Sequence, residues 1–308
     1  MVTPPARGIP RTAKSALGGG NVSHLALICV ALLATLLSGC TTINIRLAMN
    51  RGVNAFKSKE YEKAVTAFKQ AIQIDPTYAE AQLDLGLTYM ELYEPGSEHP
   101  KDQEYAEGAI QAFKKYVQLD PENQKGQEYL INICNLSKRM QDAIDFFKID
   151  YEKNPGDLKR VKTMGALYRM AGDMDKAIEF AEKDAELEPT NAEAWYTIGA
   201  YYWGRSYNSA SLDYENRMQV IDKGLAALER ATSLKKDYTE AISFQSLLYR
   251  EKMKYDISPA QAVMWRQKAD ETLAKAMELR NKAMAEAAAA AAKAAGSTPA
   301  EPAKTGGQ

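Results

Sequence analysis

Few side chains in this chain of 308 residues could perform catalysis or hold a metal ion. The sequence has two histidines, His24 and His99, and three cysteines, Cys29, Cys40 and Cys134. These residues form no Cys/His cluster of the kind that holds zinc or haem. The sequence also lacks a glycine-rich phosphate loop and the GxSxG, HExxH and CxxC motifs. It therefore predicts no cofactor, no metal site and no enzymatic activity.

One cysteine stands at a position where a covalent modification is expected. Three basic residues and no acidic residue precede an apolar stretch of 13 residues, Leu25–Leu37, which is interrupted only by Thr35. This stretch is too short to span a bilayer as a mature helix, and it ends in Leu37-Ser38-Gly39-Cys40. The pattern resembles the lipobox of bacterial lipoproteins. That resemblance implies cleavage before Cys40 and acylation of its thiol, whereas the alternatives are an uncleaved membrane anchor or an ordinary secretory signal.

The remaining cysteines and charges agree with this interpretation. Cleavage would remove Cys29 and leave Cys134 alone beside the modified Cys40, so no disulfide is expected within the mature chain. Cleavage would also leave 36 basic and 40 acidic residues, and this balance argues against a nucleic-acid-binding surface. Thr41, rather than Asp, follows the cysteine, and by the enteric pattern this favours the periplasmic face of the outer membrane over the inner membrane.

The elements that position the other side chains repeat along the chain with a period of 34 residues. In the window that begins at Leu158, apolar residues recur at the i, i+3, i+4, i+7 spacing of a helix face, and a second such face follows the break at Gly172. Small residues recur at positions 8 and 20, and proline recurs at position 32. The residues that define the repeats are Gly52, Ala64, Pro76, Gly86, Ala109, Pro121, Ala143, Pro155, Gly165, Ala177, Pro189 and Gly199.

This pattern resembles the tetratricopeptide repeat (TPR) family rather than an unrelated helical bundle. The resemblance implies an all-α, right-handed superhelical solenoid of about six helix pairs, in which each pair buries its apolar side against the next. We expect a signal peptide at 1–39, a lipidated linker at 40–44, the solenoid at 45–295 and a disordered tail at 296–308. The expected repeats are 45–78, 79–123, 124–157, 158–191, 192–238 and 239–295.

Two repeats carry insertions, and the last repeat is degenerate. The insert around 94–103 contains Pro and Gly and is expected to be a loop, with His99 as an exposed loop residue rather than a metal ligand or catalytic group. The second insert has few breakers and is expected to extend the following helix from near Ser211. In the last repeat, Ser258-Pro259 is typical of a helix start, and the alanine-rich helix that follows is expected to cap the solenoid and then fray.

Protein binding is the function that the repeats predict. In this family the first helices line a concave groove, and the candidate groove residues here are Tyr129, Asn132, Lys159, Lys162, Arg169, Tyr196 and Trp203. They give a basic section followed by an aromatic one, which would suit a segment with acidic and apolar side chains. Tyr196 and Trp203 have an equally good alternative role in internal packing. Met49 and Val53 occupy the positions of the Lys/Asn clamp with which some family members bind a C-terminal carboxylate, so that specificity is not expected.

The sequence therefore predicts a lipid-anchored periplasmic scaffold that binds protein partners and assists assembly of an outer-membrane or envelope complex. The alternative is an accessory lipoprotein subunit of a transport or peptidoglycan-processing complex. The expected partners are proteins or peptides together with the membrane that holds the anchor, and no nucleic acid.

Overall fold

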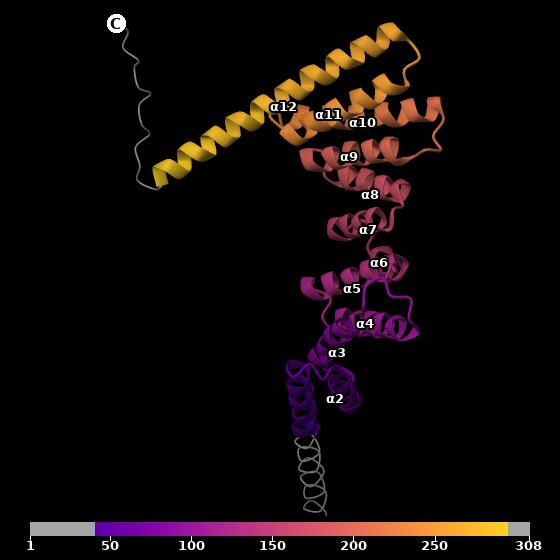
Figure 1. The fold of residues 1–308 in the computed structure, drawn as a ribbon, viewed down its shortest axis with the longest axis vertical. Coiled ribbons are helices and arrows are strands. Elements are labelled where there is room, and N and C mark those ends of the chain that lie inside the picture. Colours follow the sequence, from indigo (N-terminus) through magenta and orange to yellow (C-terminus); the bar gives the residue numbers. More distant parts are fainter. Residues whose placement is uncertain (1–40, 295–308) are drawn as a thin grey trace, which may run out of the picture. The chain divides into compact units, whose positions relative to one another are not determined.

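A computed structural model of the chain describes residues 41–294 (Figure 1). The expected signal peptide, Cys40 with its expected modification, and the expected C-terminal tail lie outside the described residues. Within 41–294 every regular element is a helix, and no strand occurs. The all-α prediction is therefore confirmed. Across the same residues, no helix combines the length and the apolar composition needed to cross a bilayer.

The chain divides into two compact units, residues 1–127 and 128–308. The first contains a helix at 41–57, α2 (Tyr61–Ile74), α3 (Ala79–Leu92) and α4 (Pro100–Leu119). Residues 41–44, which we expected to form a linker, are helical. The first helix therefore begins before the expected repeat boundary at residue 45, because nothing between Thr41 and Lys57 interrupts the helical pattern.

A recurring contact between a glycine and a large side chain closes the helix pairs. A Cβ atom added to Gly86 of α3 would lie 2.6 Å from a ring carbon of Phe113 in α4, which is closer than real Cβ contacts come. Gly52 meets the ring of Phe68 in the same way. In the second unit, Gly199 meets Leu228. Glycine recurs at position 8 because the partner helix fills the space that a side chain would need.

The insert in the second repeat is only partly a loop. Residues 93–99 are irregular, but 100–103 belong to α4, so the loop prediction was wrong for these four residues. The helix extends because Pro100 occupies its first turn and His99 Nδ1 accepts a hydrogen bond from the Lys101 backbone N–H at 3.1 Å. Ser97 Oγ donates to Asp102 at 2.6 Å and fastens the loop to the helix. His99 is thus an exposed helix cap.

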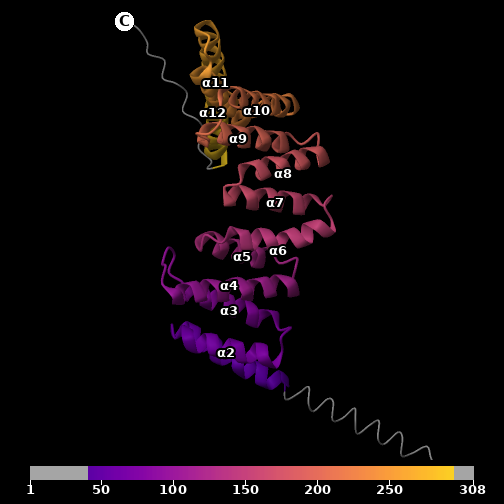
Figure 2. The same cartoon turned by 90° about the vertical axis from the view of Figure 1, so that its right-hand side faces the viewer.

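The second unit continues the helix pairs. Its elements are α5 (Gln124–Leu136), most of which lies in this unit, α6 (Met140–Lys153), α7 (Leu158–Ala171), α8 (Met174–Leu187), α9 (Ala192–Asn208), α10 (Tyr214–Leu234), α11 (Thr239–Tyr255) and α12 (Pro259–Ala294). From α6 onward each helix contacts the next, and α9 also contacts α11. In Figure 2, α7, α8 and α9 lie as successive layers of this unit. Cys134 is buried in α5, as its place in the repeat predicts.

The insert in the fifth repeat lengthens both helices of its pair. We expected only α10 to be extended, from near Ser211, but α9 continues to Asn208 and α10 begins at Tyr214. Arg217 explains the sharp connection, because its guanidinium is buried and donates to the Ser206 and Ser209 carbonyl oxygens, the latter at 2.7 Å. Carbonyl groups at the end of α9 thereby gain a charged donor.

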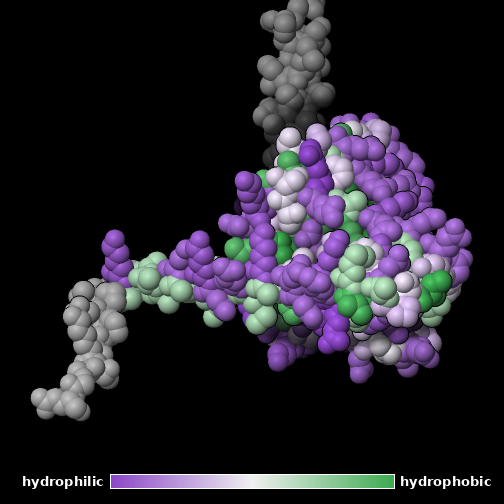
Figure 3. Space-filling model, turned by 90° about the horizontal axis from the view of Figure 1, so that it is seen from above, coloured by the Kyte–Doolittle hydropathy of each residue, from purple (hydrophilic) through white to green (hydrophobic). Residues whose placement is uncertain are grey.

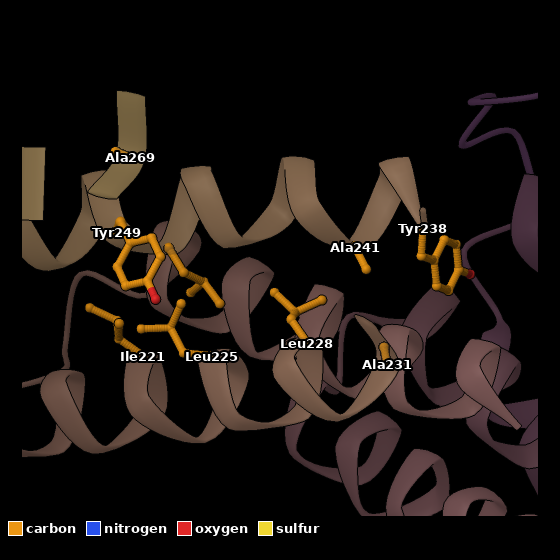
Figure 4. Packing of buried hydrophobic residues seen from close by; sticks show 9 residues of the cluster. Ile221, Leu225, Leu228, Ala231, Tyr238, Ala241, Tyr249 and Ala269 are labelled. Atoms are coloured by element: carbon orange, nitrogen blue, oxygen red, sulfur yellow. The ribbon is translucent and has the colours of Figure 1, made fainter. Parts of the chain in front are cut away.

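The last helix begins as the sequence predicts and extends far beyond its last buried side chain, Ala276. The Gln261 N–H approaches Ser258 Oγ at 3.4 Å, and α12 then runs for 36 residues. Ala269 joins a core formed by α10 and α11, in which Leu228 and Leu248 are fully buried (Figure 4). Ala269 and Ala276 are the buried side chains of α12 among those described. The alanine-rich end of the helix projects as an arm in Figure 3.

Candidate functional site

A hollow of about 240 Å³ lies between α7, α8 and α9, all within the second unit. We call it the α7–α9 hollow. The first helices of two consecutive repeats, α7 and α9, form its walls, and α8 forms its floor. The residues that line it are Val161, Lys162, Gly165 and Ala166 of α7, Phe180, Ala181 and Asp184 of α8, and Asn191, Glu193, Ala194, Thr197 and Tyr201 of α9 and its cap.

Small residues keep the hollow open. A Cβ atom on Gly165 would lie 3.3 Å from the Cβ of Phe180, so α7 and α8 approach closely at this point. The Phe180 ring turns aside and stacks on Tyr168, with ring centroids 5.5 Å apart. Because Gly165, Ala166 and Ala194 have little or no side chain, the space above α8 is left unfilled.

Lys162 is the only predicted groove residue that lines the hollow, and two acidic side chains form ion pairs with it there. Its Nζ donates to Glu188 Oε2 at 3.0 Å and lies 3.7 Å from Asp184 Oδ1. Burial opposes the charge of Lys162, but Glu188 and Asp184 outweigh it and raise the pKa of the amine. Glu188 is itself held by the Asn191 side-chain amide at 2.9 Å, and this bond together with Lys162 lowers its pKa.

Asp184 forms the polar floor of the hollow. The residue is 8 % exposed, and its Oδ1 accepts no hydrogen bond from the described part of the chain. Burial raises the pKa of this carboxyl group, and although Lys162 opposes the shift, Glu188 and Glu193 add to it. The Lys162 ammonium group lies 3.7 Å from Oδ1, which makes it a nearby counter-charge that is too distant for a hydrogen bond. The hollow therefore contains an oxygen that would gain from a hydrogen-bond donor brought in by a ligand.

The remaining polar groups of α9 lie on the wall of the hollow opposite α7. Tyr201 is half-buried, and burial raises the pKa of its phenol, against the opposing charge of Arg169. Thr197 donates to the Glu193 carbonyl oxygen at 2.9 Å. Around the hollow, Asp184, Glu188 and Glu193 face two cationic groups, Lys162 and Arg169, so acidic groups are in excess.

The two predicted aromatic groove residues lie on the other side of α9, away from the hollow. Tyr196 contacts Tyr238 and Phe244, with ring centroids 5.2 and 5.5 Å apart. Trp203 packs edge-on against Phe244 at 5.4 Å and stacks on Tyr207 at 5.3 Å. We call this set the α9–α11 aromatic contact. Both rings are partly buried and take part in packing between neighbouring first helices.

The other predicted groove residues are dispersed. Tyr129 is half-buried and Asn132 exposed on α5, while Lys159 is exposed at the start of α7. Within the hollow, Lys162 already meets two carboxylates, and the predicted aromatic residues lie outside it. A partner segment with acidic and apolar side chains therefore stays a prediction for the wider groove.

Sequence reasoning overlooked Asp184, Glu193, Thr197 and Tyr201 as candidates. A signal was present for Asp184, which occupies position 27 of its repeat, where the first repeat has the fully buried Ala71. An acid at a buried register position is the pattern that could have been noticed. No group of three or more potential metal ligands occurs in residues 41–294.

Comparisons with known proteins agree with the repeat pattern. Residues 55–92 match the family model described as a TPR repeat. No curated protein sequence matches the chain. Among solved structures, MamA is 26% identical over 63% of this chain and 95% of its own, with a TM-score of 0.36. YrrB, titled a TPR protein with an unusual peptide-binding site, is 21% identical over 63% of this chain and 88% of its own, with a TM-score of 0.36.

A third structure, a TPR repeats protein (BF2334) from Bacteroides fragilis NCTC 9343, is 13% identical. That match covers 68% of this chain and 98% of the other, with a TM-score of 0.41. The family-model match places a TPR-type repeat over the end of the first helix, α2 and α3.

Proposed function

We propose that this chain is a non-catalytic scaffold that binds a segment of a protein partner in the α7–α9 hollow and is held at a bacterial envelope membrane through lipid on Cys40. The observation that carries the binding site is the buried Asp184 carboxylate. Its Oδ1 lacks a hydrogen-bond donor at the floor of an open hollow between the first helices of two repeats.

The chemistry of the hollow favours a lysine or arginine side chain of the partner. The hollow has room for one side chain of that size, and the acidic groups around it outnumber the cationic ones. An ammonium or guanidinium group would donate to Asp184 Oδ1 and form a charge-assisted hydrogen bond. Bound charge would also lower the raised pKa of Asp184, since an opposite charge nearby favours the ionised carboxylate.

Peptide binding to the full chain tests this site. A pool of fluorescent peptides, each with one central lysine, is compared by fluorescence polarisation with the same pool carrying acetyl-lysine, which has no charge. We expect the lysine pool to bind more tightly to the wild type and this preference to disappear in Asp184→Asn. Glu186→Gln, a matched change at an exposed position of the same helix, should retain it. Equal binding of both pools to the wild type would contradict the proposal.

The membrane part of the proposal depends on the sequence alone. Leu37-Ser38-Gly39-Cys40 follows an apolar stretch, and Thr41 follows the cysteine; this is the pattern that supports a lipid anchor at the periplasmic face of the outer membrane. A scaffold so placed would assist assembly of an envelope complex. Replacing Cys40 with Ser should move the protein from the membrane fraction to the soluble fraction and remove the mass of the acyl chains. A variant that stays in the membrane fraction with unchanged mass would refute the anchor.

A further inference from the structure

The helix at 41–57 has one exposed face that carries no acidic residue. Ile45 and Met49 point into the first unit and are buried. At about 100° per residue, seven of the exposed side chains of this helix fall on one face roughly 140° wide. The members of this face are Ile43, Arg46, Leu47, Asn50, Arg51, Asn54 and Lys57. We call it the N-terminal basic face.

The charge of this face is opposite to that of the rest of the molecule. Seven of the 39 basic residues and none of the 40 acidic residues precede Glu60, which leaves 32 basic and 40 acidic residues from Glu60 onward. Four of the seven, Arg46, Arg51, Lys57 and Lys59, belong to the described helix and the turn after it. The positive charge is therefore concentrated in the part of the chain that directly follows Cys40.

Two large aliphatic side chains lie on the same face and have little protein around them. Ile43 is 61 % exposed and Leu47 is 48 % exposed, one helical turn apart. Leu47 and Arg51 also line a shallow hollow beside Gln70 and Gln73 of α2. Aliphatic side chains flanked by arginines are typical of helices that lie in the interface of a bilayer. Anionic headgroups attract such basic residues within about a Debye length.

We infer that the N-terminal basic face rests on an anionic lipid surface and so fixes how the first unit meets the membrane. The inference rests on the proposed anchor at Cys40, which would place this helix next to the headgroups. The arginines would contact lipid phosphates, and Ile43 and Leu47 would enter the boundary between headgroups and acyl chains. A flexible tether would leave the orientation of the protein free, whereas this contact restricts it.

Quenching by brominated lipids tests the contact in the full chain. Ile43→Trp adds a fluorophore on the face, and the three native tryptophans provide a background that the unsubstituted chain measures. The protein, purified from an expressing envelope, is reconstituted in brominated phosphatidylcholine vesicles with or without phosphatidylglycerol. We expect the added tryptophan to be quenched more strongly when phosphatidylglycerol is present. Ile149→Trp, at a similarly exposed position (59 %), should show no dependence on lipid charge.

Removing charge from the face should abolish that dependence. Arg46→Gln with Arg51→Gln would reduce the equilibrium constant for contact with the anionic surface roughly thirtyfold, at about 1 kcal/mol per basic residue. Lys223→Gln with Arg230→Gln, both exposed on α10, removes the same charge elsewhere and should change nothing. Equal quenching in both vesicle types would overturn the inference, as would a change in oligomeric state caused by the face variants, which would assign the face to a second copy of the chain.

Failure of the anchor gives a different result. A chain without a lipid anchor would remain in the supernatant with phosphatidylcholine vesicles. If it then sediments with phosphatidylglycerol vesicles and the double arginine variant does not, the face binds lipid although the anchor is absent. If it sediments with neither, the face does not bind lipid either.

Discussion

Helix α9 has a different neighbour on each side, and the two contacts are built from different side chains. Toward α11, the partly buried rings of Tyr196 and Trp203 contact Tyr238 and Phe244. Toward α7, Ala194 and Thr197 face Gly165 and Ala166 across the α7–α9 hollow. Large rings close the space between two first helices, whereas small residues leave it open above a buried carboxylate. The comparison shows how one repeat geometry can pack aromatic rings on one side and leave a hollow on the other.

Substitutions on the packed side should have the largest effect on stability. Trp203→Ala removes a partly buried ring that contacts Phe244 and Tyr207. We expect the free energy of unfolding to fall by about 2–4 kcal/mol, somewhat less than for a fully buried tryptophan. Urea denaturation followed by circular dichroism measures it. Tyr207→Ala, at a ring that is 58 % exposed, should lower the free energy of unfolding by less. Equal losses in the two variants would mean that the contact between Trp203 and Phe244 adds nothing to stability.

A substitution that fills the α7–α9 hollow should have the second-largest effect on stability. Gly165→Leu places a side chain against Phe180 and into the hollow, so we expect overpacking to cost about 1–3 kcal/mol. The same denaturation experiment measures the change. Gly156→Leu is the matched control, since a Cβ atom there meets nothing within 4 Å. An unchanged unfolding midpoint for Gly165→Leu would count against the close α7–α8 crossing.

Asp184→Asn should stabilise the free protein while weakening the binding of lysine peptides. The pKa of Asp184 is raised above its usual value of 3.8, so the ionised form is penalised in the folded state. That penalty is fully present above the raised pKa and disappears as the pH falls through it. The variant should therefore be more stable than the wild type at neutral pH, and the difference should shrink as the pH falls toward 3.8. Denaturation across this pH range measures it, and a destabilised variant at neutral pH would show that Asp184 stabilises the fold.

The coupling between Lys162 and Asp184 should be the smallest effect. Their charged atoms are 3.7 Å apart and the lysine side chain is 46 % exposed, so water screens the pair. A double-mutant cycle with Lys162→Gln and Asp184→Asn should give a coupling energy of about 0.5 kcal/mol. A coupling several times larger would mean that the hollow excludes water and is already closed without a ligand.

The repeat register and the helices could be predicted from the sequence because they depend on the spacing of residues that are close together in the chain. The helix pair at 158–191 follows from apolar residues at helical intervals and from glycine and asparagine at the breaks. Asp157 and Asn191 cap their helices as expected, at 3.0 Å in both cases. The extended α9 was not predicted, because the stability of its last turn comes from Arg217, which is distant in sequence.

The site was only partly predictable for a similar reason. Position 27 holds an aspartate in two consecutive repeats, at Asp150 and Asp184, and the sequence does not distinguish them. In the fold, Asp150 is exposed and pairs with Arg160 at 2.8 Å, while Asp184 is buried, and its Oδ1 accepts no hydrogen bond and lies 3.7 Å from the Lys162 ammonium group. The difference depends on which side chains the neighbouring helices bring to the carboxylate.

The sequence by itself determined that this chain forms helix pairs at a fixed interval, because small residues at set positions allow two helices to touch and large ones fill the gap between them. The sequence also determined that the residues before Glu60 include basic side chains and no acidic ones, since charge is a property of composition. Only the tertiary structure decided which gaps between first helices stay open. That outcome depends on contacts between residues tens of positions apart, such as Trp203 with Phe244, which no single repeat contains.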